Sequence, residues 1–280
     1  MQLVINISLT LLLSFNSHLL CEKSRQKETL GQTSSKTSKI KPNHKFKKAI
    51  QFQNIADIPV PSGYERVIVD HASFGNYLRN LSLNTKDKTV YAYDGSIVMD
   101  ETYGYQFAVI DMDIGKRDLQ QCADAVMRLR AEYLYQEKKY RDIHFNFLSD
   151  NKARYYTTYS KTDRSYTKFR KYMDYIFAYA NTASLKKELT KVDKPENMQI
   201  GDIFIQSGQP FGHAVIVVDV AVNKQNGDKI FMVAQSFMPA QSIHILKNKN
   251  EDLNPWYSVN FNEQIVFPSW TFYPTDLRRF

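Results

Sequence analysis

The stretch that decides the fold reads Gly115-Lys-Arg-Asp-Leu-Gln-Gln-Cys-Ala-Asp-Ala-Val-Met-Arg-Leu-Arg-Ala-Glu-Tyr-Leu-Tyr135, and it predicts a helix. Asp118 is a suitable N-cap, and Gln121 follows three residues later, as in a capping box. Strong helix formers come next, without an internal Gly or Pro. One side repeats at helical spacing and is expected to face the core: Cys122, Val126, Leu129 and Tyr133.

A second side of this helix carries Asp124, Arg128 and Glu132, each four residues from the next. Opposite charges at this spacing support one another along a helix. Cys122 then lies in the first turn, on or beside the inward face. A helix N-terminus stabilises a thiolate, whereas free cysteines are among the most buried and inert residues. Cys122 is therefore either a nucleophile or a small core residue.

The amino end predicts a leader over residues 1–21. Residues 1–20 carry no charge and include an apolar run from Leu9, which is too short and too interrupted for a membrane span and is typical of a signal peptide. Cys21 stands where a lipoprotein carries its lipid. If the leader is cleaved before Cys21 the thiol is lipidated, and if after, it is lost. Either way Cys122 is left without a disulfide partner, which marks it as a reactive thiol.

Residues 22–50 predict a basic, disordered tether. They are polar and Ser/Thr-rich, with nine Lys and Arg against two Glu, and supply +7 of the net charge of +8. Residues 51–280 are nearly neutral, with 28 basic and 27 acidic residues, and are expected to form a single α+β domain. This balance argues against nucleic-acid binding. We expect an exported monomer in the cell envelope, periplasmic or lipid-anchored, which meets the membrane only through its leader or a lipid at Cys21.

Further elements can be predicted along the domain. Apolar patterning predicts strands, helices and a Tyr-rich loop in this order: strand 64–69, helix 73–81, strand 105–113, strand 143–148, loop 155–166, helix 167–180, a short helix from Ser184, and strands 200–205, 212–219 and 230–237. Asp111 and Asp113 end one strand, but no further ligand stands at metal spacing nearby. Neither a metal nor another cofactor is indicated.

The last third of the chain adds a base and a polar partner to the cysteine. His213 begins its strand, and Gln235 lies on the next strand. With Cys122 they make a nucleophile, a base and a group that orients the base, which is the minimal set for thiol acyl chemistry.

Strand register is left open by the sequence. If Asn226-Gly227 formed the centre of a tight hairpin, His213 would lie opposite Ala240 and Gln235 would point to the other face. A differently centred loop or a bulge would bring Gln235 onto the face of His213, and Ser236 is the alternative orienter. Asp219 shares that face but lies roughly 20 Å along the strand, which is too far.

These motifs resemble papain-like cysteine hydrolases, including the bacterial cell-wall peptidases of the NlpC type. Gly212-His-Ala-Val looks like the histidine strand of that family, Gly201-Asp202 like the Gly-Asp before it, and Gln235-Ser-Phe like its Asn-Ser-Trp. The resemblance implies a papain-like α+β fold in which the Cys122 helix packs on an antiparallel sheet. It implies catalytic Cys122, His213 and Gln235, an oxyanion group at Gln120 or Gln121, and supporting Asp202, Ser236 and Arg128.

A second resemblance spans most of the domain, from about Pro59 to Phe280. The helix from Asp118, the Gly-His-Ala-Val strand, Ala234-Gln-Ser-Phe-Met-Pro-Ala-Gln-Ser-Ile-His and the closing Leu277-Arg-Arg-Phe look like the bacterial family called domain of unknown function 4846. It implies an exported bacterial protein without a settled activity.

Three hypotheses follow. In the first, the protein is a cysteine hydrolase or acyltransferase that acts on an amide or ester, such as a cell-wall peptide. In the second, it is a non-catalytic envelope protein that binds glycan or a protein partner through the Tyr-rich loop 155–166. In the third, Cys122 is a structural core residue of an unrelated α+β fold.

Overall fold

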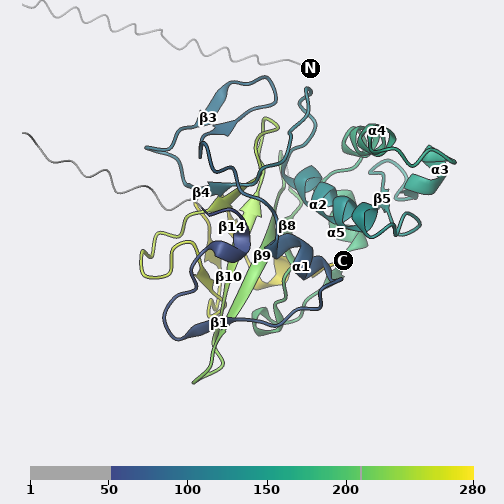
Figure 1. The fold of residues 1–280 in the computed structure, drawn as a ribbon. Helices are drawn as coiled ribbons and strands as arrows, with labels where there is room; N and C mark the ends of the chain where they lie inside the picture. Colours follow the sequence, from purple (N-terminus) through teal and green to yellow (C-terminus); the bar gives the residue numbers. More distant parts are fainter. Residues whose placement is uncertain (1–51, 209) are drawn as a thin grey trace, which may run out of the picture. The chain divides into compact units, whose positions relative to one another are not determined.

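The structure is a computed structural model that describes residues 52–208 and 210–280. The leader predicted over 1–21 and the tether predicted over 22–50 lie outside the described residues. The fold is a mixed α+β arrangement around one large antiparallel sheet (Figure 1). Its α+β class and antiparallel pairing confirm the prediction from the sequence.

The main sheet has nine strands, and its path runs β4 (Gln106–Val109), β11 (His244–Leu246), β10 (Lys229–Gln235), β9 (His213–Asn223), β8 (Ile203–Gln206), β15 (Leu277–Arg279) and β7 (Thr190–Lys191). Off this path, β1 (Tyr64–Arg66) pairs with β9 and β12 (Tyr257–Ser258) pairs with β10. Three two-stranded hairpins complete the strands: β2 (Val90–Tyr91) with β3 (Ile97–Met99), β5 (His144–Asn146) with β6 (Ala153–Tyr155), and β13 (Ile265–Val266) with β14 (Thr271–Phe272).

Five α-helices are found among the described residues: α1 (Phe74–Arg79), α2 (Cys122–Gln136), α3 (Tyr156–Ser160), α4 (Tyr166–Phe177) and α5 (Thr182–Glu188). Helix α1 begins after Ser73, whose hydroxyl accepts the Asn76 N–H at 3.1 Å, close to the start of the helix predicted over 73–81. Helix α2 packs on β9 and β10, so the cysteine helix lies on the sheet that carries His213 and Gln235.

Strand β9 separates two apolar layers. Ala214, Ile216 and Val218 join the layer that contains the buried residues of α2, whereas Val215 and Val217 join the layer on the opposite face. Successive side chains of a strand point to opposite faces. Because β9 is buried on both faces, it is apolar along most of its length rather than alternating with polar residues.

A β-bulge sets the register of β9 against β10. Met232 pairs with Asp219, but Val233 pairs with Val217, which leaves Val218 without a partner on β10. An extra residue of this kind reverses which face later side chains occupy. The bulge therefore brings Gln235 onto the face of His213, as one of the two alternatives from the sequence requires.

The start of α2 differs from the prediction. The helix begins at Cys122, its N-cap is Gln121, and the Gln121 N–H donates to Asp124 Oδ2 at 3.1 Å. Asp118, predicted as the N-cap, instead accepts the N–H of Ala240 at 2.7 Å and the side-chain amide of Gln121 at 3.0 Å. The Asp118 carboxylate therefore binds the distant loop that contains Ala240, although local capping rules predict that it would cap α2.

Two segments are more buried than their composition suggests. Asp124, Arg128 and Glu132, the charged side of α2, are each less than a tenth exposed. The segment 155–166 is not an open loop, since much of it is helix α3 and the ring of Tyr156 is fully buried. In both places tertiary packing covers polar side chains that local spacing would leave in water.

Candidate functional site

Cys122 lines a cavity of about 410 Å³ at the N-terminus of α2. The walls come from the first turn of α2, the start of α5, the loop before β9, and Met238. The thiol is the free cysteine of the described residues, and Cys122 is 5% exposed. The candidate nucleophile is therefore almost buried, at the edge of a hollow large enough for part of a small ligand.

The sulfur of Cys122 lies against the backbone at the start of β9. Its Sγ donates to the Gly212 carbonyl at 3.9 Å, and the backbone of Ala214 also hydrogen-bonds the sulfur. Gly212 has to be glycine, because a Cβ there would lie 2.3 Å from the carbonyl oxygen of Gln206 and 2.5 Å from Thr182 Oγ1. The missing side chain lets β9 start this close to its neighbours.

The pKa of the Cys122 thiol is raised, which is the opposite of the effect of a helix N-terminus alone. Burial raises it to about 11, and Asp124 adds to the rise at a pH at which its carboxyl is ionised. A helix N-terminus should lower the pKa of a thiol. Loss of hydration outweighs that effect here, so the resting side chain is a neutral thiol.

Asp124 is a candidate site residue that sequence reasoning missed. It lines the same cavity and is 7% exposed, and its Oδ1 has no hydrogen-bond partner. Burial raises the pKa of its carboxyl well above the usual value, which favours the neutral acid. An acid in the first turn of a helix normally faces solvent, and nothing in the local sequence distinguishes this one.

His213 and Gln235 are in contact, as one of the alternatives left open by the sequence requires. His213 Nε2 lies 2.8 Å from Gln235 Oε1, and both side chains are buried. The imidazole ring is enclosed by Phe237, Trp270 and Phe272, with ring centroids 4.8 to 5.9 Å away. These aromatic neighbours hold the ring in one orientation.

The hydrogen bonds around Gln235 fix the proton of His213. His244 Nδ1 faces the Ser242 carbonyl at 2.9 Å and must donate to it, so Nε2 of the neutral His244 ring is an acceptor. Gln235 Nε2, at 3.4 Å, donates to that nitrogen, which turns Oε1 of Gln235 towards His213 and the hydroxyl of Ser269. His213 Nε2 therefore carries the proton. Its Nδ1 keeps a lone pair and has no hydrogen-bond partner.

Both histidines are neutral at ordinary pH, because burial lowers the pKa of His213 and of His244 to about 4. His244 is a second residue that the sequence does not single out. Strand register places it beside Gln235.

No thiol–imidazole hydrogen bond is formed between Cys122 and His213. The His213 side chain leaves β9 on the face opposite Ala214, which packs on the side of α2. The sulfur nevertheless lies against the backbone on either side of His213. Of the two ring nitrogens, Nδ1 is the one bonded nearest to that backbone. The thiol thus contacts the backbone that carries His213, whereas the His213 ring lies on the other face of the strand.

Gln120 and Gln121, the two candidates for the oxyanion site, point in different directions. Gln121 lines the cavity beside Cys122, and its amide is held by Asp118. Gln120 points elsewhere, because its Oε1 accepts from Arg128 Nη1 at 2.8 Å and the residue does not line the cavity.

The supporting candidates are structural. Ser236 Oγ lies 3.1 Å from the Gln120 carbonyl and 2.9 Å from the Gln241 carbonyl, so it joins two loops and does not orient His213. Asp202 binds Arg279 on the last strand at 2.6 and 2.7 Å. Arg128 lies inside a separate polar cluster, away from the wall of the Cys122 cavity.

Within residues 52–208 and 210–280, no three His, Cys, Asp or Glu side chains gather as a metal-binding group. In the same part of the chain, no helix combines the length and apolar character needed to cross a bilayer.

Fold and site together define a mixed α+β protein with a buried cysteine at a helix start and a buried His–Gln pair on the sheet beneath. The chain belongs to the family described as domain of unknown function (4846), whose model matches residues 55–279. No curated protein and no solved structure matches the chain.

Proposed function

We propose that the protein is an exported papain-like cysteine hydrolase or acyltransferase that acts on an amide or ester. The observation that carries the proposal is the proton assignment at His213. The Nε2–H of His213 donates to Gln235 Oε1, which leaves Nδ1 buried, unprotonated and without a hydrogen-bond partner, while the Cys122 sulfur contacts the carbonyl of the preceding residue, Gly212. An unused basic nitrogen of this kind is what a general base requires.

In the proposed reaction, His213 Nδ1 takes the thiol proton as the sulfur attacks the carbonyl carbon of the substrate. The new S–C bond forms, and the carbonyl electron pair becomes an oxyanion. Collapse of this intermediate expels the amine or alcohol, which takes its proton from His213. Water, or the acceptor in acyl transfer, then cleaves the thioester by the same steps in reverse.

The two pKa values make this a reaction of a neutral pair. The thiol, with a pKa of about 11, and His213, with a pKa of about 4, do not exchange a proton at rest. Proton transfer therefore accompanies attack, and the sulfur must first turn from the Gly212 carbonyl towards Nδ1. Gln121 and the neutral acid of Asp124 are donors on the same cavity wall and can stabilise the oxyanion.

The cavity favours an uncharged or cationic acyl group. Its described lining contains no Lys or Arg, while Asp118 and Asp124 supply carboxyl groups. The larger apolar side chains are Leu119, Leu148, Phe177, Phe211 and Met238. An anionic group would find no counter-charge there.

Acyl transfer from p-nitrophenyl acetate tests the proposal without knowledge of the substrate. We expect an acetyl thioester on Cys122, detected by peptide mass spectrometry and released by hydroxylamine. His213→Ala should slow its formation about 100-fold or more, the usual range for loss of a general base. Gln235→Ala should slow it less, because it only loosens the ring. The matched control is His144→Ala, since His144 does not line the cavity.

A specific observation favours a second candidate, a non-catalytic envelope protein that binds a glycan or a protein. The thiol is buried and contacts backbone rather than imidazole. This candidate predicts equal acetylation rates for the wild type and His213→Ala, or no acetylation of the folded protein. Either result would rule out the hydrolase proposal.

A further inference from the structure

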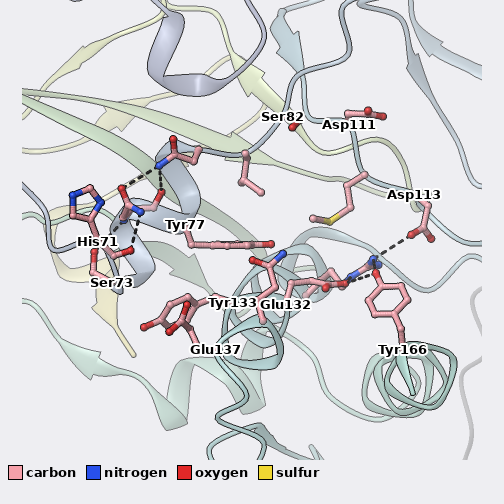
Figure 2. Close-up of a pocket in the computed structure, with 16 residues that line it drawn as sticks. His71, Ser73, Tyr77, Ser82, Asp111, Asp113, Glu132, Tyr133, Glu137 and Tyr166 are labelled. Carbon is pink, nitrogen blue, oxygen red and sulfur yellow. Dashed lines mark hydrogen bonds and ion pairs between the residues drawn. The ribbon is translucent and has the colours of Figure 1, made fainter. Parts of the chain in front are cut away.

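Two large cavities among the described residues differ in whether their polar walls are satisfied. The cavity of about 530 Å³ between α1, α2 and α4 is polar (Figure 2), but none of its lining residues has a buried side-chain nitrogen or oxygen without a hydrogen-bond partner. Arg128, for example, binds both Glu132 and Asp113. In the cavity of Cys122, Asp124 Oδ1 is an atom without a partner. A buried polar group that the protein leaves unpaired indicates a ligand more directly than the charge of a wall does.

Asp124 can offer a ligand a proton donor. Its Oδ2 accepts the backbone N–H of Gln121 at 3.1 Å, and the residue is 7% exposed. The described lining of the cavity contains no Lys, Arg or His that could balance a charge. A carboxyl group buried without a cation favours the neutral acid, and burial raises the pKa of Asp124 accordingly. The proton then belongs on Oδ1, because Oδ2 is already an acceptor, and the Oδ1–H has no acceptor of its own.

Two other polar side chains of this wall are already bonded within the protein. Asn181 Oδ1 caps α5 by accepting two backbone N–H groups, at 2.9 and 3.1 Å. Asp118 Oδ1 accepts from the side chain of Gln121 and from the backbone of Ala240. A ligand therefore meets Asp124 as an unpaired polar group among side chains that have partners.

The rest of the wall offers a ligand apolar surface. Phe211 is 59% exposed and Leu148 is 48% exposed, and both line the cavity. Phe177 and Met238 line it as well. Covering large exposed apolar side chains is favourable, and such side chains gathered at a cavity are typical of a binding site. The wall thus combines one unpaired donor with surface for an apolar chain.

We propose that the Cys122 cavity binds an uncharged amide or ester, with its carbonyl oxygen on Asp124 Oδ1 and its apolar chain on Phe211 and Leu148. A carbonyl oxygen is an acceptor without a proton of its own, which suits the free Oδ1–H. An ammonium would bring only donors, and a carboxylate would bring a charge to a wall without Lys or Arg. The inference rests on the proposed function, because it names the substrate class of the same site.

Isothermal titration calorimetry on the full chain at neutral pH tests this inference with four probes. N-Methylhexanamide carries the proposed group. Hexanoate and n-hexylamine carry charged groups on a chain of similar length, and N-methylacetamide lacks the chain. We expect N-methylhexanamide to bind at millimolar concentration or below, and each of the other three to bind at least about tenfold more weakly.

Substitutions test the two contacts separately. Asp124→Leu removes the donor and should weaken binding of N-methylhexanamide at least about tenfold, whereas Asp124→Asn keeps an N–H donor and should stay within about threefold of the wild type. If Asp124→Leu does not fold, Phe211→Ser replaces it and should weaken binding at least about threefold. The matched control is Ile97→Ser, which should leave the affinity unchanged, because Ile97 is 64% exposed and does not line the cavity.

Three results would overturn the inference: affinity for either charged probe as high as for N-methylhexanamide, no binding of that amide, or equal effects of a test variant and its control. The control is Asp124→Asn for Asp124→Leu, and Ile97→Ser for Phe211→Ser. Acetylation of Cys122 is measured separately. Acetylation without amide binding removes this inference alone, and amide binding without acetylation removes the proposed reaction alone.

Discussion

At the scale of single residues, environment decides what Cys122 and His213 can do. A position at a helix N-terminus favours a thiolate, but burial of the sulfur raises the pKa of Cys122 to about 11. A neutral imidazole with a pKa of about 4 does not stabilise a thiolate by charge. In the proposed reaction, Cys122 therefore loses its proton only during attack on the substrate.

We predict that native Cys122 reacts slowly with iodoacetamide near pH 7.5, on the order of 100-fold slower than a free thiol with a pKa near 8.5. Only the thiolate reacts, and a raised pKa lowers its fraction, so the rate should rise about tenfold per pH unit up to about pH 10. His213→Ala should leave the native rate almost unchanged, since the imidazole is neutral. The measurement is the alkylation rate against pH, with urea-unfolded protein as the free-thiol control. A rate that levels off below pH 8 would instead mean a thiolate–imidazolium pair.

At the scale of elements, the start of β9 and its register against β10 position His213 and Gln235. Gly212 lets the strand begin against Gln206 and Thr182, and the next residue is His213. The bulge at Val218 then puts Gln235 within 2.8 Å of the His213 ring. A tight, regular hairpin would have separated the two side chains by the thickness of the sheet.

Gly212→Ala should destabilise the protein by about 1–3 kcal/mol, the range for overpacking a buried site. Its Cβ would meet a carbonyl oxygen at 2.3 Å, and a backbone atom cannot turn away as a side chain can. The free energy of urea unfolding measures the effect. Gly227→Asn is the control, because nothing lies within 4 Å of a Cβ there and asparagine tolerates the positive φ of 78°. Similar losses in both variants would contradict the steric explanation.

At the scale of the whole molecule, a buried ion cluster joins segments that are far apart in the chain. Asp219 on β9 is fully buried and binds Arg66 at 2.6 Å and Arg79 at 2.7 Å. Arg66 also donates to the carbonyl of Ile58 at 2.6 Å. The cluster therefore links β1, α1 and the segment around Ile58 to strand β9 of the main sheet.

Asp219→Asn should lower the free energy of unfolding by about 3 kcal/mol, because removing one partner leaves two half-desolvated guanidinium groups without a counter-charge. Chemical denaturation followed by circular dichroism measures the loss. Asp150→Asn breaks a surface pair with Arg154 and serves as the control, with no measurable change expected. If the two substitutions have equal effects, Asp219 does not fasten these segments.

Local rules determined much of this fold from the sequence. Helix formers and a repeat of apolar residues predict α2, the helix predicted over 73–81 covers α1, and runs of β-branched residues predict β8, β9 and β10. These features depend on neighbours within a few residues, so the sequence carries them in full. The order of His213 and Gln235 along the chain also predicts that they lie on neighbouring strands, but it leaves open whether they share a face.

Only the tertiary structure decided the rest. The bulge that aligns His213 with Gln235 depends on pairing between strands, and the capture of Asp118 by Ala240 depends on a loop more than 100 residues away. The burial of Asp124 and Glu132, and the raised pKa of Cys122, depend on which elements cover α2. Hydration is lost through packing by segments distant in sequence, and no local pattern records which side chains will lose it.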